Sequence, residues 1–216
     1  MKLLRLALAL LACALTTSPA FAELALSLGG GLSFDKHEFQ GMGSGPHYSL
    51  NGQGRTAQIE LTRRDALTLS GRPIDASLSL HFGGPEFVDT ASNGRAWVTG
   101  LDRSARIRTT RALVTLSTPV LQQGNWSLDL GVGAGLAQTD VTLRHGQATA
   151  RQRDTLPHAV LSMRAGRTSA DGSTRVWSEL RYHTSPALTL TYSDGEQRRY
   201  EVSGMELAAG VTFFFD

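Results

Sequence analysis

The sequence predicts an all-β fold: an eight-stranded antiparallel up-and-down transmembrane β-barrel. Three observations lead to this prediction. Apolar residues repeatedly occupy every second position, which is the geometry of a strand with one apolar face. The connections between these stretches are short on one side and long on the other, as in barrels inserted into a membrane from one side. The chain also begins with an export signal and ends on an alternating aromatic segment.

The first 22 residues have the three parts of a secretory signal peptide. Lys2 and Arg5 precede an apolar run, and Ala20-Phe21-Ala22 supplies the small residues that signal peptidase reads. We therefore expect cleavage after Ala22, which leaves residues 23–216 as the barrel domain. Cys13 lies in a loose lipoprotein-like box and offers an alternative cleavage site, but that signal would be unusually short.

Charge and cysteine content narrow the possible functions of the mature chain. The whole sequence holds 21 Lys and Arg against 19 Asp and Glu, and two of the cations, Lys2 and Arg5, belong to the predicted signal. The mature chain is then electroneutral, so charge gives no case for a nucleic-acid partner. The single cysteine, Cys13, allows neither an internal disulfide nor a cysteine zinc cluster.

Four stretches alternate strongly and four more alternate weakly. The first runs from Leu24 to Phe34, with small or polar residues between its leucines. The strong stretches are residues 24–34, 74–82, 126–136 and 205–215, and the weak ones are 57–61, 112–116, 159–165 and 176–182. Eight strands follow from this pattern, with ten as the open alternative.

The links between these strands alternate in length. Short links are expected at residues 70–73, 119–125 and 168–173, and long loops at 35–54, 83–102 and 139–155. Asp194-Gly195 suits a two-residue type I′ turn at the tip of the last hairpin. His37, His47 and His145 then fall in long loops, and no histidine pair has metal-ligand spacing, so we expect neither a metal nor a cofactor.

Charged residues share the polar face of the predicted strands. They are Glu60, Asp75, Asp129, Glu179, Glu206, Arg111, Arg164, Arg175 and Arg181. A secreted soluble sandwich would turn this face outward, whereas a membrane barrel would turn it inward. Because eight strands enclose a lumen that side chains fill, we expect these charges to pair inside the barrel and to exclude a wide channel.

Aromatic residues stand at the expected strand ends, as interfacial girdles require. Phe34, Phe82 and Tyr182 lie toward the long loops, and Trp126, Phe213 and Phe215 lie toward the short turns. The last segment resembles the terminal strand of outer-membrane β-barrel proteins, although Asp216 follows the final aromatic residue. This resemblance implies insertion by the barrel assembly machinery and an outer-membrane location in a Gram-negative-type envelope.

As an architecture, the mature chain resembles the small outer-membrane barrels that include opacity-type and attachment-type surface proteins. The resemblance implies a non-enzymatic structural or surface-interaction role that the extracellular loops carry. The expected partners are outer-membrane lipid and lipopolysaccharide, which the basic residues Arg144, Arg151 and Arg153 of the third long loop could contact. An extracellular ligand is not identified by the sequence.

One local motif suggests an enzyme instead. His183 and Ser185, with Glu196 downstream, resemble the His-x-Ser region of outer-membrane lipid A deacylases, and Pro186 departs from that pattern. The resemblance implies an acyl-ester hydrolase.

An Asp194-Gly195 turn would place Glu196 about 25 Å from Ser185 along the hairpin. The same turn would place Glu206 opposite His183. The alternative catalytic set is therefore Ser185, His183 and Glu206. The other interpretation is a His183–Glu206 hydrogen bond within the interior charge network.

Overall fold

A computed structural model describes residues 24–41, 47–89, 103–145, 148–191, 193, 195 and 197–215, so the predicted signal peptide lies outside the described residues. All regular structure in this part is β. The strands are β1 (Leu24–Gly41), β2 (His47–Leu69), β3 (Arg72–Asp89), β4 (Arg103–Gln123), β5 (Trp126–His145), β6 (Ala148–Thr168), β7 (Thr174–Thr184), β8 (Leu188–Thr191) and β9 (Gln197–Phe215). No helix in these ranges is long and apolar enough to cross a membrane.

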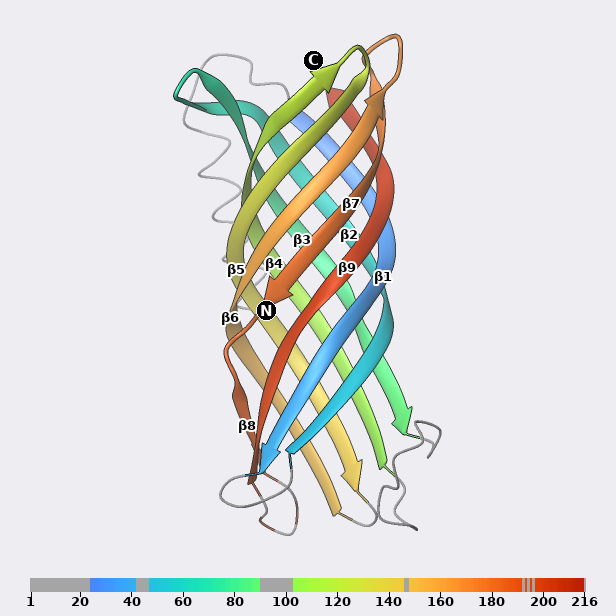
Figure 1. Cartoon of the computed structure of the whole chain (residues 1–216), viewed down its shortest axis with the longest axis vertical. Helices are drawn as coiled ribbons and strands as arrows, with labels where there is room; N and C mark the ends of the chain where they lie inside the picture. Colours follow the sequence, from blue (N-terminus) through green and yellow to red (C-terminus); the bar gives the residue numbers. More distant parts are fainter. Residues whose placement is uncertain are drawn as a thin grey trace.

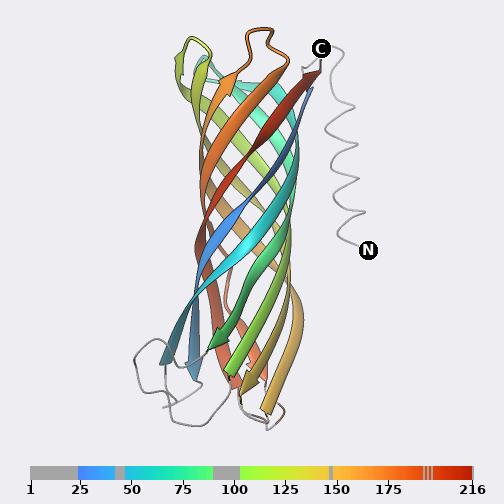
Figure 2. The ribbon, with the colours of Figure 1, turned by 90° about the vertical axis from the view of Figure 1, so that its right-hand side faces the viewer.

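The strands form a closed antiparallel ring (Figures 1 and 2). Each strand from β1 to β6 pairs with the next one in the chain, and β1 pairs with β9 along its whole length. Because β7 and β8 both pair with β9, they are two segments of one wall strand, and the described wall has eight strands. The eight-stranded prediction is confirmed, and neither the sandwich nor the ten-stranded alternative fits this ring.

The predicted long loops are mostly strand. The β1–β2 ladder continues to Gln40↔His47, and the β5–β6 ladder continues to His145↔Ala148. His37, His47 and His145 therefore lie on strands, which corrects the expectation that they lie in loops. The alternation of apolar residues does not predict these strand ends, because a strand outside the lipid needs no apolar outward face. Its ladder of hydrogen bonds can therefore continue where the sequence no longer alternates.

The predicted short turns are confirmed between β2 and β3, β4 and β5, and β6 and β7. Gly71 (φ 76°) and Gly124 (φ 59°) take the left-handed conformation that such turns require. In the β6–β7 turn, Asp171 accepts hydrogen bonds from the Ser169 hydroxyl and from the Ser173 backbone N–H and hydroxyl, and these lower the pKa of its carboxyl.

An apolar belt surrounds the half of the barrel nearest these turns. On β5 the outward side chains are apolar from Trp126 to Leu136, and on β9 from Met205 to Phe215. Ten or eleven tilted residues span the hydrocarbon core of a membrane. Leucine, valine and aromatic side chains in the belt are about half exposed, among them Val132 at 62%.

The expected aromatic residues are exposed at the edges of the belt. Phe34, Phe82 and Tyr182 are each more than 40% exposed on the side away from the turns. At the turn side, the Arg167 guanidinium lies 5.7 Å from the ring of Trp126. Such pairing of arginine with aromatic rings suits the interface between lipid chains and water.

Two inward glycines make room for the largest side chain in the lumen. Trp177 is 4% exposed, and a Cβ on Gly29 or Gly210 would overlap its ring. The Arg164 guanidinium lies 4.6 Å from the same ring. The facing glycines thus allow a tryptophan and an arginine to stack within the narrow lumen.

We expect Gly29→Ala to lower the free energy of unfolding by about 1–3 kcal/mol, because the new methyl group overpacks the lumen. Gly30→Ala is the matched control, since Gly30 faces outward and its added Cβ would meet a single neighbour, the Thr56 carbonyl oxygen at 3.2 Å. Urea unfolding from phospholipid vesicles, followed by tryptophan fluorescence, measures both. Equal destabilisation by the two variants would contradict the overpacking argument.

Candidate functional site

The lumen at the level of the belt holds a continuous network of ion pairs. Arg164 on β6 forms a bidentate pair with Glu60 on β2, with Nη1–Oε1 and Nη2–Oε2 distances of 2.6 and 3.0 Å. Glu179 on β7 accepts from Arg164 Nη2 at 2.9 Å and from Arg181 Nη2 at 2.7 Å. Strands on opposite sides of the ring are therefore joined across the lumen.

Glu206 on β9 extends the network away from the short turns. Its Oε2 accepts from Arg111 Nη1 at 3.1 Å, and its Oε1 accepts from Thr56 Oγ1 at 2.9 Å. Arg181 Nη1 lies 3.5 Å from the same Oε1. Glu206 is fully buried, so these partners replace the water that its charge would otherwise require.

The prediction that the charged face points inward is confirmed. Of the nine residues, Glu60, Arg111, Glu179, Arg181 and Glu206 are each at most 5% exposed. Arg175 Nη2 lies 2.7 Å from Asp129 Oδ2, and Asp75 accepts the Asp65 backbone N–H at 2.9 Å. The nine charges therefore line one enclosed surface, and eight of them are held in ion pairs.

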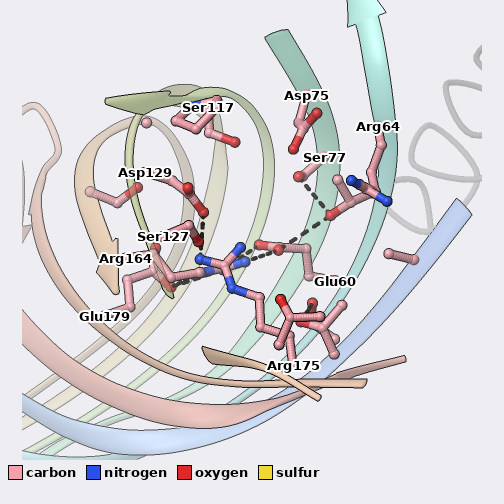
Figure 3. Close-up of a pocket in the computed structure, with 18 of the residues that line it drawn as sticks. Glu60, Arg64, Asp75, Ser77, Ser117, Ser127, Asp129, Arg164, Arg175 and Glu179 are labelled. Atoms are coloured by element: carbon pink, nitrogen blue, oxygen red, sulfur yellow. Dashed lines mark hydrogen bonds and ion pairs between the residues drawn. The ribbon is translucent and has the colours of Figure 1, made fainter. Parts of the chain in front are cut away.

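Between this network and the short turns, a polar cavity of about 300 Å³ occupies the end of the lumen. Figure 3 shows Asp75, Asp129 and Arg175 on its walls, with Glu60 and Arg164 joined by dashed lines beside them. On the other side of the network the lumen holds both apolar and polar side chains: Val141 and Leu190 are fully buried, and Gln152, which lies opposite Val141, donates a hydrogen bond to Asp154.

The predicted set of Ser185, His183 and Glu206 rests on a register that the structure does not have. His183 lies opposite Gly204, and it is Arg181 that lies opposite Glu206. The tip is longer than the predicted two-residue turn, since β8 ends at Thr191 and β9 begins at Gln197. Residues 185–187 interrupt the wall strand and separate the registers of β7 and β8.

Ser185 contacts a histidine other than His183. Its Oγ lies 2.8 Å from Nδ1 of His158 on β6, and the His158 ring centroid lies 5.3 Å from that of His183. Both histidines face the lumen and are at most 4% exposed. The β6–β7 ladder, which ends at Ala159↔Thr184, brings His158 beside Ser185.

The wall beside this cluster has a seam. The β6–β7 ladder ends at Ala159↔Thr184, and β8 pairs with β9 alone. Among the described residues, β6 therefore has no ladder partner on this side until Thr149, whose carbonyl accepts the Ser193 N–H at 3.0 Å. Pro157 and Pro186, which lack a donor N–H, stand at the lower end of the seam.

The same part of the chain contains no group of three or more His, Cys, Asp or Glu side chains arranged to hold a metal ion. Its chemical groups of interest are therefore the ion-pair network and the Ser185–His158 pair. The charges of the first are paired with one another. The second is a serine hydroxyl within hydrogen-bond distance of a histidine nitrogen.

We expect Glu206→Gln to lower the free energy of unfolding by about 3 kcal/mol, because it leaves Arg111 and Arg181 buried with one charge too few. Asp140→Asn is the control. It removes a carboxylate whose partners Arg151 and Arg153 are 76% and 64% exposed, and it should cost less than about 1 kcal/mol. Urea unfolding in vesicles distinguishes the two, and a Glu206→Gln variant as stable as the control would contradict a stabilising network.

No family model and no curated protein matches the sequence. Solved structures do match the fold. The outer membrane protease OmpT from Escherichia coli aligns with a TM-score of 0.56 and 10% identity, covering 94% of this chain and 100% of that chain.

A major outer membrane protein from Thermus thermophilus aligns with a TM-score of 0.53 and 11% identity, covering 90% and 100% of the two chains. Neisserial surface protein A aligns with a TM-score of 0.50 and 12% identity, covering 88% and 99%. At these identities the likeness concerns the fold alone. By its fold, the chain is a small outer-membrane-type β-barrel.

Proposed function

We propose that this chain is a non-enzymatic integral outer-membrane barrel with a structural or surface-interaction role. The observation that carries the proposal is the closed lumen. Glu60–Arg164 and Arg111–Glu206 are ion pairs that join opposite walls of the ring across the lumen. A lumen filled in this way leaves no continuous aqueous path for solutes.

The surface role is supported by the length of the strands. Beyond the apolar belt the ladders continue, and the outward side chains become polar, as at Thr142 and Thr155. Hydrogen-bonded strands hold this extension stiffly above the membrane and present its tips to the outside. The ligand of those tips is not identified.

Two further parts of the proposal concern the route to the membrane. Residues 1–22 form a cleavable signal peptide, with cleavage after Ala22, because they have its charged, apolar and small-residue parts. The strand that ends at Phe215 carries its aromatic side chains to the last position of β9, which is the feature that we expect the barrel assembly machinery to bind.

We expect the purified barrel to show no stable conductance steps in planar lipid bilayers, because ion pairs span its lumen. The double variant Glu60→Ala/Arg164→Ala removes one complete pair and should allow small conductance events. The double variant Gln138→Ala/Thr155→Ala, which changes two outward side chains and leaves the ion pairs intact, is the control and should show no conductance events. Steady conductance by the unaltered barrel would overturn the closed-lumen proposal.

Ester hydrolysis is the second candidate, and the Ser185–His158 hydrogen bond is the observation that favours it. A serine hydroxyl 2.8 Å from a histidine nitrogen has the geometry of a nucleophile and its base. The pair also stands just above the apolar belt, at the end of the β6–β7 ladder. Against it, Arg111 and Arg181 hold Glu206, the carboxylate of the expected set, and Arg181 rather than His183 lies opposite it.

Incubation with lipopolysaccharide, followed by mass spectrometry of the lipid A, separates the two candidates. We expect no loss of acyl chains, because Arg181 rather than His183 lies opposite Glu206 and two arginines hold that carboxylate. If acyl chains are lost with the unaltered barrel but not with Ser185→Ala, the chain is an ester hydrolase and the non-enzymatic proposal is wrong. In that case, His158→Ala and His183→Ala would identify the histidine that acts as base.

A further inference from the structure

Three exposed arginines surround one aspartate on the outer face of β4, β5 and β6. Arg108 lies opposite Asp140, which lies opposite Arg153. Arg153 Nη2 is 2.8 Å from Asp140 Oδ2, and Arg151 Nη2 is 3.9 Å from the same atom. We call these four residues the basic row. Its formal charge is +2, although the mature chain as a whole is electroneutral.

The strand register fixes the height of the basic row above the apolar belt. Three successive outward rows cross the same three strands, two residues apart: first Ala112, Leu136 and Pro157, then Thr110, Gln138 and Thr155, then Arg108, Asp140 and Arg153. Each step is about 7 Å along a strand. The outer face therefore changes from apolar to neutral polar to cationic over a short distance.

This order matches the order of groups in an anionic lipid. Acyl chains lie against apolar side chains, carbonyl and hydroxyl groups lie against neutral hydrogen-bonding side chains, and phosphates lie against cations. Guanidinium groups bind phosphate oxygens through paired N–H donors. A single aspartate cannot satisfy the donors of three arginines, so donors remain for a second anion.

We propose that the basic row binds the phosphate group of an anionic outer-leaflet lipid. This inference rests on the proposed outer-membrane placement of the barrel. Asp140 acts as a spacer: it holds Arg151 and Arg153 over β5 and competes with the phosphate for their donors. Removing its charge should therefore strengthen lipid binding, whereas removing the arginines should weaken it.

The experiment titrates the purified barrel in non-ionic detergent with lipid A, and in parallel with the same lipid after its phosphates are removed. Native mass spectrometry counts the bound lipid. We expect the phosphorylated lipid to bind more tightly, and Arg151→Gln/Arg153→Gln to weaken it by at least tenfold, at about fivefold per arginine. Asp140→Asn should tighten binding by about fivefold.

Arg55→Gln is the matched control, because Arg55 is an exposed outward arginine on β2, separated from β4 by β3. It should leave lipid binding unchanged. Equal binding of the dephosphorylated lipid, or an equal loss with Arg55→Gln, overturns the proposal. Displacement of the lipid by an equal concentration of inorganic phosphate would instead indicate a site for free phosphate.

The conductance measurement distinguishes this inference from the proposed function. None of the variants in the basic row touches the lumen, so a barrel that loses lipid binding should remain closed. If the unaltered barrel is closed but binds phosphorylated and dephosphorylated lipid equally, the lipid site on the basic row is refuted and the closed-barrel role is not. An open lumen with intact lipid selectivity refutes the closed-barrel role alone.

Discussion

The rest of the structure depends on the pairing of charges inside a ring too narrow for water to solvate them. Arg164 bridges Glu60 and Glu179, and Arg181 connects Glu179 to Glu206, so one network joins β2, β6, β7 and β9. Each of these buried charges would destabilise the fold without its partners, because nothing else would offset its loss of hydration. The outer face, by contrast, is held by lipid, and its apolar side chains need no particular partner.

The difference between the paired interior and the lipid-facing surface is also seen in how side chains of the wall fit into the lumen. The glycines on β1 and β9 leave space for Trp177, and Trp177 supports Arg164 from one side while the carboxylates hold it from the other. Ladder closure between β1 and β9 fixes which side chains meet across the ring. Each interior side chain therefore needs particular neighbours, whereas the side chains of the apolar belt do not.

The same division decides what could be predicted from the sequence. Lipid imposes a strict period on residues such as those from Trp126 to Leu136, so the spanning strands, the inward charges and the short turns could be predicted. The extensions to His47 and His145 could not, because a strand outside the lipid needs no apolar outward face, so its sequence does not have to alternate. The His183–Glu206 pairing failed because the tip is longer than a two-residue turn and because the break at residues 185–187 offsets β8 from β7. Ser185 meets His158 through the β6–β7 register, which no local pattern records.

The seam between β6 and β8 has a consequence for how the protein could diversify. The outer half of the last hairpin is joined to the ring by the ladder between β8 and β9, and among the described residues its hydrogen bonds to β6 are those between Ser193 and Thr149. A change of length or sequence in that hairpin therefore disturbs few ladder bonds. Natural variation and grafted peptides should be accommodated there more readily than in the β5–β6 hairpin, where the two strands pair to their ends.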